Sequence, residues 1–161
     1  MNRIYVLIAL SLLVSCSTTK YYVVRHAEKE PATTMTTDVL LTDAGKQRAL
    51  SLASKLNNKK IQHIYSTNFA RTRATAQPLS IKTGVAIENY TPGDASFIKK
   101  LKELPKGNVL IVGHSNTVDD IVNGLTGKAD LKDLDEAAYG DLFIVKKKGT
   151  KYILSQEHFG N

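Results

Sequence analysis

The feature of this sequence that most limits its fold is a regular alternation of short apolar runs with segments of helical periodicity. The first run, residues 21–24, is apolar and rich in β-forming residues, as in a strand buried on both faces. Similar runs predict strands at residues 61–66, 85–90 and 108–114. Helical segments lie between and after them, at residues 43–56, 67–84, 94–104 and 117–125.

This order of strands and helices predicts an α/β fold, a three-layer α/β/α sandwich around a mostly parallel sheet. Residues 140–160, with a turn near Lys148 and Gly149, predict an antiparallel hairpin at one edge of the sheet. Pro78 is expected to interrupt or bend its helix. The chain has 161 residues and no internal repeat or linker. We therefore predict one domain over residues 20–161.

The chain is basic, with a formal net charge of +7 and a pI near 9.4. This charge favours anionic partners, such as phosphorylated compounds, nucleic acid or an acidic membrane surface. Aromatic residues make up only 7% of the chain and no basic helix stands out, which argues against nucleic acid. The one lysine run, residues 146–148, fits the tip of the predicted hairpin. We therefore expect a phosphorylated partner and no nucleic acid.

The first residues resemble a bacterial lipoprotein signal. Arg3 gives a short basic start, and residues 4–14 form an apolar stretch that is too short to span a membrane. Residues 13–16, Leu-Val-Ser-Cys, resemble the lipobox, in which the cysteine is lipidated and becomes the new N-terminus. Cys16 is the only cysteine of the chain, so no internal disulfide can form.

We therefore expect a signal peptide over residues 1–15 and a lipid-attached tether over residues 16–19. The protein would be held to a membrane of the cell envelope by the lipid on Cys16, facing the periplasm or the exterior. The alternative is a buried N-terminal strand with a chance cysteine.

Charged and polar residues follow three of the predicted strands. Arg25 and His26 follow the first strand, Ser66 ends the second, and Gly113 and His114 end the fourth. Ligand sites of parallel sheets lie at such carboxyl ends. A glycine before His114 permits an unusual backbone angle or a close approach.

Arg71 lies in the first turns of the helix after the second strand, where an arginine is well placed to hold a phosphate. Arg73 lies about 200° further around that helix and should face elsewhere. Each feature alone also fits a structural role, and His63 and His158 are given no other role.

Together these motifs resemble the histidine phosphatase superfamily, also called phosphoglycerate mutase-like. The resemblance is carried by Arg25-His26, by residues 41–49, by residues 66–76 with Arg71, and by Gly113-His114-Ser115. Ala27 replaces the glycine common after the first histidine, as in the small members of the superfamily. Residues 90–108 leave no room for a large cap domain, so the pocket should be shallow and open.

The resemblance implies that His26 is the nucleophile and forms a phosphohistidine that water hydrolyses. A neutral imidazole attacks only if its other ring nitrogen keeps its proton on an acceptor, for which we expect a backbone carbonyl. Arg25, Arg71 and His114 would hold the phosphoryl oxygens, with His114 either a cation or a neutral donor. No metal or other cofactor is expected, and the sequence has no metal-ligand spacing such as Cys-x-x-Cys.

The family supplies the leaving-group proton from a carboxylic acid. Asp94 is the preferred candidate because it lies at a loop-to-helix junction, although a helix cap explains it equally well. Glu88 and Glu28 are the alternatives. Glu28 and Lys29 could instead line the mouth of the pocket.

The resemblance predicts a monomeric, metal-independent phosphatase that hydrolyses phosphate monoesters of small molecules. Two alternatives stay open. One is a non-catalytic envelope lipoprotein that binds anions. The other is a protein phosphohistidine phosphatase, which the predicted signal peptide argues against because that signalling is cytoplasmic.

Overall fold

The computed structural model describes residues 18–34 and 37–160. Its strands are β1 (Thr19–Arg25), β2 (Ile61–Ser66), β3 (Ile87–Asn89), β4 (Asn108–Gly113), β5 (Asp141–Lys148) and β6 (Lys151–His158). They form one sheet in the order β3-β2-β4-β1-β5-β6. The first four strands are parallel, whereas β5 pairs antiparallel with β1 and β6 antiparallel with β5. The predicted fold class is therefore confirmed, including the C-terminal hairpin.

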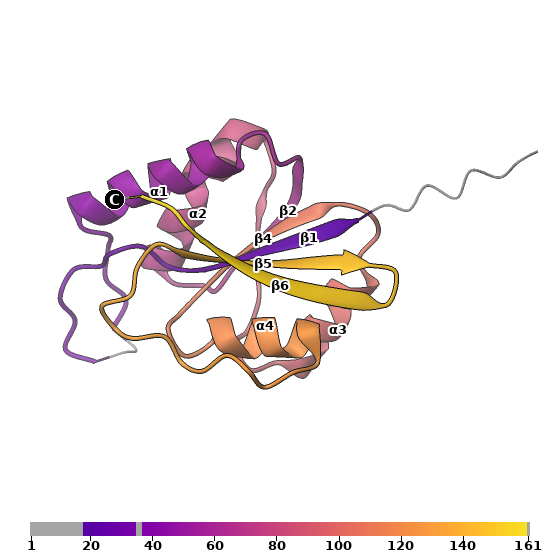
Figure 1. Cartoon of the computed structure of the whole chain (residues 1–161). Coiled ribbons are helices and arrows are strands. Elements are labelled where there is room, and N and C mark those ends of the chain that lie inside the picture. Colours follow the sequence, from indigo (N-terminus) through magenta and orange to yellow (C-terminus); the bar gives the residue numbers. More distant parts are fainter. Residues whose placement is uncertain (1–17, 35–36, 161) are drawn as a thin grey trace, which may run out of the picture.

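Two helices cover each face of the sheet (Figure 1). On one face lie α1 (Asp43–Leu56) and α2 (Ala70–Thr83), and on the other lie α3 (Ala95–Glu103) and α4 (Val118–Thr126). Strands β1 to β4 are parallel, so their carboxyl ends lie at the same end of the sheet, and the loops after β1, β2 and β4 gather there. The predicted site residues should meet at this end.

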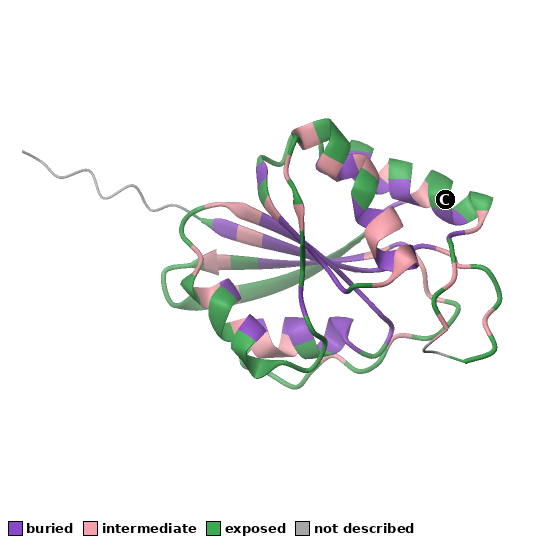
Figure 2. Cartoon of the chain, turned by 180° about the vertical axis from the view of Figure 1, so that it is seen from behind, coloured by how far each residue is buried: buried purple, intermediate pink, exposed green. Residues whose placement is uncertain are grey.

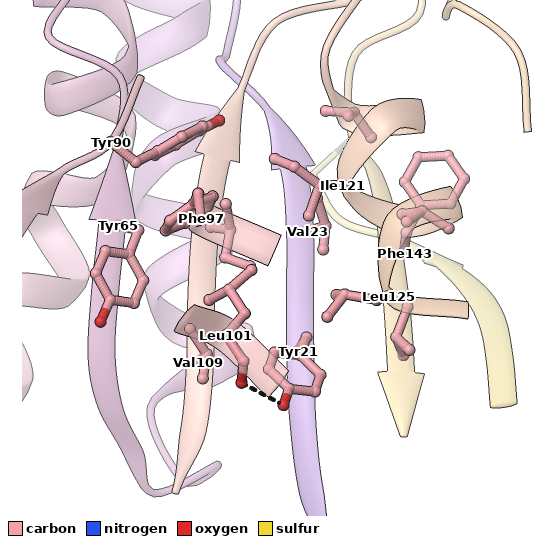
Figure 3. Packing of buried hydrophobic residues seen from close by; sticks show 14 residues of the cluster. Tyr21, Val23, Tyr65, Tyr90, Phe97, Leu101, Val109, Ile121, Leu125 and Phe143 are labelled. Atoms are coloured by element: carbon pink, nitrogen blue, oxygen red, sulfur yellow. Dashed lines mark hydrogen bonds between the residues drawn. The ribbon is translucent and has the colours of Figure 1, made fainter. Parts of the chain in front are cut away.

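Alternate residues of β1 are buried in two separate cores. Tyr21 and Val23 pack with residues of α3 and α4, whereas Tyr22 and Val24 pack with residues of α1 and α2. The strand is buried on both faces, as its sequence predicts (Figure 2). In the first core the Tyr21 hydroxyl donates a hydrogen bond of 2.8 Å to the carbonyl oxygen of Leu101 (Figure 3). This bond ties the last turn of α3 to the centre of the sheet.

Helix α2 differs from its prediction in where it begins and in the effect of Pro78. It begins at Ala70 rather than at residue 67, and the N–H of Ala70 donates to Asp38 Oδ1 at 2.8 Å. It also continues through Pro78 to Thr83, so the proline does not end it. Buried residues on both sides of the proline, including Ala76 and Leu79, hold the helix against the sheet. This packing offsets the hydrogen bond that proline removes.

The predicted signal peptide and Cys16 lie outside the described residues. Thr19, the last residue of the predicted tether, is the first residue of β1 and pairs with Lys147. Within the described ranges no helix combines the length and the apolar character needed to cross a bilayer.

Candidate active site

The carboxyl ends of β1 and β4 and the first turn of α2 surround a cavity of about 280 Å³. We call it the histidine cavity. It is lined by Arg25, His26, Lys29, Arg71, His114, Ser115 and Glu136, together with residues 32–34. The four predicted phosphate-handling residues thus come together. In the sequence, Arg71 lies 46 positions after Arg25, and His114 lies 88 positions after His26.

The backbone of His26 is fixed to β4, because its N–H donates to the Gly113 carbonyl at 2.9 Å. Its ring Nδ1 lies 2.8 Å from the carbonyl oxygen of Ala27. A carbonyl oxygen only accepts hydrogen bonds, so Nδ1 carries the ring proton and Nε2 carries the lone pair. The predicted backbone acceptor is confirmed. The ring is therefore held in the tautomer that a nucleophilic Nε2 requires.

The His26 ring is neutral at physiological pH. Its pKa is lowered from 6.5 to about 3, mainly by burial; the charges of Arg25 and Arg71 add to this effect, and the Ala27 hydrogen bond opposes it. The His114 ring lies edge-on, with the two ring centroids 5.5 Å apart. A neutral ring keeps the lone pair that a nucleophile requires.

His114 is also neutral in this arrangement. Its Nε2 lies 2.9 Å from Thr67 Oγ1, which in turn donates to Thr72 Oγ1 at 3.0 Å. Its Nδ1 lies 3.5 Å from Arg71 Nη2, and since a guanidinium only donates, Nδ1 is the unprotonated nitrogen. Burial, followed by the charges of Arg71 and Arg25, lowers the pKa of the ring to about 4. Of the two states predicted for His114, the geometry matches the neutral one.

Gly113 is required by a close approach. A Cβ at this position would lie 2.8 Å from both Thr117 Oγ1 and the Tyr90 hydroxyl oxygen. Thr117 Oγ1 accepts a 2.9 Å hydrogen bond from the backbone N–H of His114. A larger residue would therefore push on the group that positions His114. The backbone angle of Gly113 is not in the left-handed region, so the close approach is the reason for the glycine.

Arg71 is buried at the start of α2. One Nη donates to the Thr37 carbonyl at 3.1 Å, and the guanidinium stacks 4.4 Å from the centre of the Phe69 ring. Arg73 instead donates to Asn89 Oδ1 at 2.8 Å, outside the histidine cavity. The prediction that the two arginines face different ways is confirmed.

Arg25 is buried and held by the loop before β5. Its Nη1 donates to the carbonyls of Asp135, Glu136 and Ala138 at 3.0, 2.8 and 3.3 Å. Its Nη2 donates to the Glu136 carboxylate at 2.7 Å, and its guanidinium lies 4.4 Å from the Tyr139 ring centre. The same carboxylate accepts a hydrogen bond from the Ser115 hydroxyl. Arg25 Nε is buried and has no hydrogen-bond partner among the described residues, so one donor of this side chain is still available.

The comparisons with known proteins agree with this geometry. A family model described as histidine phosphatase superfamily, branch 1, matches residues 21–91, which include Arg25, His26 and Arg71. The chain has the fold of this superfamily. No curated protein matches the chain significantly.

Several solved structures of the histidine phosphatase fold superpose on nearly the whole chain. Mycobacterial glucosyl-3-phosphoglycerate phosphatase has a TM-score of 0.69 and 13% identity, covering 88% of this chain and 98% of its own. Phosphoserine phosphatase from Entamoeba histolytica, solved with 3-phosphoglyceric acid, has a TM-score of 0.67 and 16% identity, covering 89% and 97%. A structure from Agrobacterium tumefaciens, proposed to be the phosphohistidine phosphatase SixA, has a TM-score of 0.62 and 19% identity, covering 88% and 99%. At these identities the likeness concerns the fold alone.

The histidine phosphatase fold does not bring the predicted proton donors into the histidine cavity. Asp94 caps α3, where it accepts hydrogen bonds of 2.8 Å from the N–H and the hydroxyl of Ser96. Glu88 pairs with Lys100 at 3.1 Å, and Glu28 pairs with Arg48 at 2.7 Å. None of the three lines the cavity, and the capping role considered for Asp94 is confirmed. Its role as proton donor stays a prediction.

Glu136 and Tyr139, in the loop before β5, belong to the site but were not predicted from the sequence. Glu136 and Tyr139 come from a stretch with no helical or strand periodicity, and no motif marks them. Within the described part of the chain, no group of three or more His, Cys, Asp and Glu side chains is arranged to hold a metal ion.

Proposed function

We propose that this protein is a phosphatase that hydrolyses phosphate monoesters through a phosphohistidine on His26. The observation that carries the proposal is the hydrogen bond from His26 Nδ1 to the Ala27 carbonyl, within a cavity that two buried arginines line. It fixes the ring proton on Nδ1, and because burial keeps the ring neutral, the lone pair lies on Nε2, as a nucleophilic imidazole needs.

The charges around His26 suit a transferring phosphoryl group. Its equatorial oxygens carry negative charge, which fixed guanidinium and N–H donors stabilise. Arg25 and Arg71 supply the charge, and both are held in place by backbone carbonyls before any ligand arrives. Preorganised donors of this kind cost little reorganisation during the reaction.

The reaction would proceed in two in-line displacements. In the first, His26 Nε2 forms a bond to phosphorus, the P–O ester bond breaks, and the ester oxygen takes up a proton and leaves as the alcohol. In the second, water attacks phosphorus, the N–P bond breaks, and inorganic phosphate leaves. The cavity is open at about 280 Å³, so small phosphate esters fit it, and the leaving alcohol can exchange with water.

The test is a panel of phosphate esters applied to the chain from Ser17 onward. The wild-type protein should release phosphate and should be inhibited by vanadate or tungstate, which mimic pentacoordinate phosphorus. His26→Ala should abolish turnover, and denaturation during turnover should trap an acid-labile phosphate on wild-type His26 only. His63→Ala is the matched control, because His63 lies on β2 outside the histidine cavity.

Three outcomes would change the proposal. Turnover that survives in His26→Ala would rule out the phosphohistidine. A protein that binds vanadate but turns over no ester would instead fit the anion-binding alternative. Activity restricted to phosphohistidine on a protein would favour the protein phosphohistidine phosphatase. The open cavity and the fold shared with the Agrobacterium structure support that alternative.

We also propose that the mature protein is anchored to an envelope membrane by a lipid on Cys16. The support is the sequence alone, since a basic start and an apolar stretch of residues 4–14 precede the only cysteine. Cys16→Ser should leave the precursor without lipid and should move the protein out of the membrane fraction. Unchanged fractionation of that variant would contradict the anchor.

A further inference from the structure

Among the described residues that line the histidine cavity, Glu136 carries the only carboxylate. The three acids that the sequence offers as proton donors are held elsewhere, by Ser96, Lys100 and Arg48. A reaction that expels an alcohol from phosphorus needs a group that gives the leaving oxygen a proton. The cavity therefore contains one carboxyl group suited to that task by position.

The Glu136 carboxylate is held by hydrogen bonds, and its side chain is exposed to solvent. One carboxylate oxygen accepts from Arg25 Nη2 at 2.7 Å, and the other accepts from the Ser115 hydroxyl. The same turn gives three backbone carbonyls to Arg25, so the loop and the arginine hold each other in place. The Glu136 side chain nevertheless remains 65% exposed, so water and a leaving alcohol can reach it.

The charge balance of the cavity changes when a phosphate ester binds. The hydrogen bond from Ser115 and the charge of Arg25 keep the pKa of Glu136 below its usual range, so the carboxylate is ionised without a ligand. A phosphate group that bonds to Arg25 would weaken that stabilisation and place negative charge beside the carboxylate. Both changes favour a proton on Glu136 in the complex.

We propose that Glu136 is the residue that exchanges protons with the leaving alcohol and with the attacking water. In the first displacement the N–P bond forms, the P–O bond to the alcohol breaks, and the protonated carboxyl gives its proton to the leaving oxygen. In the second, water attacks phosphorus, its proton returns to the carboxylate, and the N–P bond breaks. Each turnover thus restores the carboxyl proton. This role rests on the proposed phosphatase function and gives it a catalytic residue that no sequence motif marks.

The test compares two substrates with different leaving groups. Nitrophenyl phosphate expels an acidic phenol that needs little help from an acid, whereas an alkyl phosphate expels a weakly acidic alcohol. Glu136→Gln keeps the size of the side chain and one oxygen acceptor, which can face Arg25 while the amide NH2 donates to the Ser115 hydroxyl, but it cannot give up a carboxyl proton. We expect the ratio of kcat/KM for the alkyl ester to kcat/KM for the nitrophenyl ester to fall on the order of 10²-fold.

Two further variants separate proton transfer from structural support. Asp133→Asn removes the same charge from an exposed position of the same loop and should leave the substrate ratio unchanged. Glu136→Ala should regain alkyl phosphate turnover when formate is added, because a small carboxylic acid can enter an open cavity. Circular dichroism and urea unfolding of each variant show whether it folds.

The outcomes distinguish this inference from the proposed function. A wild-type protein with turnover, and an unchanged ratio in Glu136→Gln, would overturn the proton-exchange role alone. An equal loss on both substrates without formate rescue would also overturn it, since Glu136 would then only position Arg25. Faster turnover with tighter vanadate binding would show that the carboxylate competes with phosphate, which again contradicts the proposal. A wild-type protein that hydrolyses no ester and carries no phosphate on His26 would overturn both.

Discussion

Two cavities lie near the carboxyl ends of the parallel strands, and different kinds of residue line them. The histidine cavity is lined by two buried arginines and two buried, neutral histidines. The second, of about 220 Å³, is lined by residues of the β3–α3 loop, α3 and α4; we call it the α3–α4 cavity. Its lining includes the rings of Tyr90 and Phe97, which are stacked with their centroids 4.3 Å apart. Both cavities are lined by predicted site residues, Asp94 in the second, but only the first is lined by buried cationic side chains.

This difference shows which feature of a strand end marks a site. Burial of a charged side chain is costly unless it is compensated, so a fold keeps such groups where they are paired or used. Arg25 and Arg71 are both buried beside a cavity that opens to solvent. Asp94 lies at an equivalent place in the sequence, after a strand, but it is exposed and satisfied by its own helix. A polar residue after a strand therefore does not mark the site unless it is also buried beside the cavity.

The largest effect expected from the histidine cavity is on the protonation of its rings. Burial and the neighbouring cations lower the pKa of His26 from 6.5 to about 3, a loss of proton affinity of roughly 10³-fold or more. Because the folded-state pKa is lowered, the neutral ring persists as the pH falls, until the pH nears that value. NMR titration of the ring between about pH 8 and pH 4 should show no protonation of His26 in the folded protein.

The unfolded protein in urea is the reference for this titration. A folded-state midpoint near that of the unfolded chain would show that the ring is solvated and that the cations do not act on it. The ring nitrogen signals provide a second check, since the proton should reside on Nδ1 because of the Ala27 carbonyl. A proton on Nε2 would contradict the orientation on which the proposed attack depends.

The next largest effect is expected from the charge that Arg71 brings to the cavity. Arg71→Ala removes a positioned cationic donor, which should lower kcat/KM on the order of 10²- to 10³-fold. Arg73→Ala is the matched control, because it removes the same charge from the same helix at a position that faces Asn89. Steady-state kinetics on one aryl phosphate, with vanadate inhibition constants for each variant, measures both effects.

If Arg73→Ala lost as much activity as Arg71→Ala, the effect would be one of net charge on the whole protein and not of the cavity. Raising the salt concentration distinguishes the two, since screening weakens long-range attraction far more than contacts in a buried site.

Much of this arrangement can be predicted from the sequence, for a physical reason. His26 and His114 each follow a run of apolar residues directly, and parallel strands bring their carboxyl ends to one edge. Arg71 follows from the same rule, because it opens the helix after β2. Local pattern and sheet topology together are enough to place these three side chains.

Glu136 could not be predicted in this way. It lies in an irregular stretch between α4 and β5, and its position depends on contacts with Arg25, which is 111 residues away in the chain. No periodicity sets the path of such a loop, and the carbonyls that fix Arg25 carry no side-chain signature. Pro78 shows the opposite case, in which a clear local signal was overridden by the packing of α2 on the sheet.

The smallest effect is expected at Asp94, in the α3–α4 cavity. Asn caps helices about as well as Asp, so Asp94→Asn should keep α3 and the free energy of unfolding within about 0.5 kcal/mol of wild type. Because Asp94 does not line the histidine cavity, the alkyl-to-aryl ratio of kcat/KM should also stay at the wild-type value. Urea unfolding and the two-substrate kinetics measure these quantities.

Asp94→Ala completes the comparison, because it removes the cap as well as the charge. Its unfolding free energy should fall by about 1 kcal/mol while the substrate ratio stays constant. A loss of alkyl phosphate turnover in Asp94→Asn, with stability unchanged, would instead support Asp94 as the proton donor. The β3–α3 loop would then have to bring its carboxylate to the histidine cavity when substrate binds, and the two cavities would act as one site.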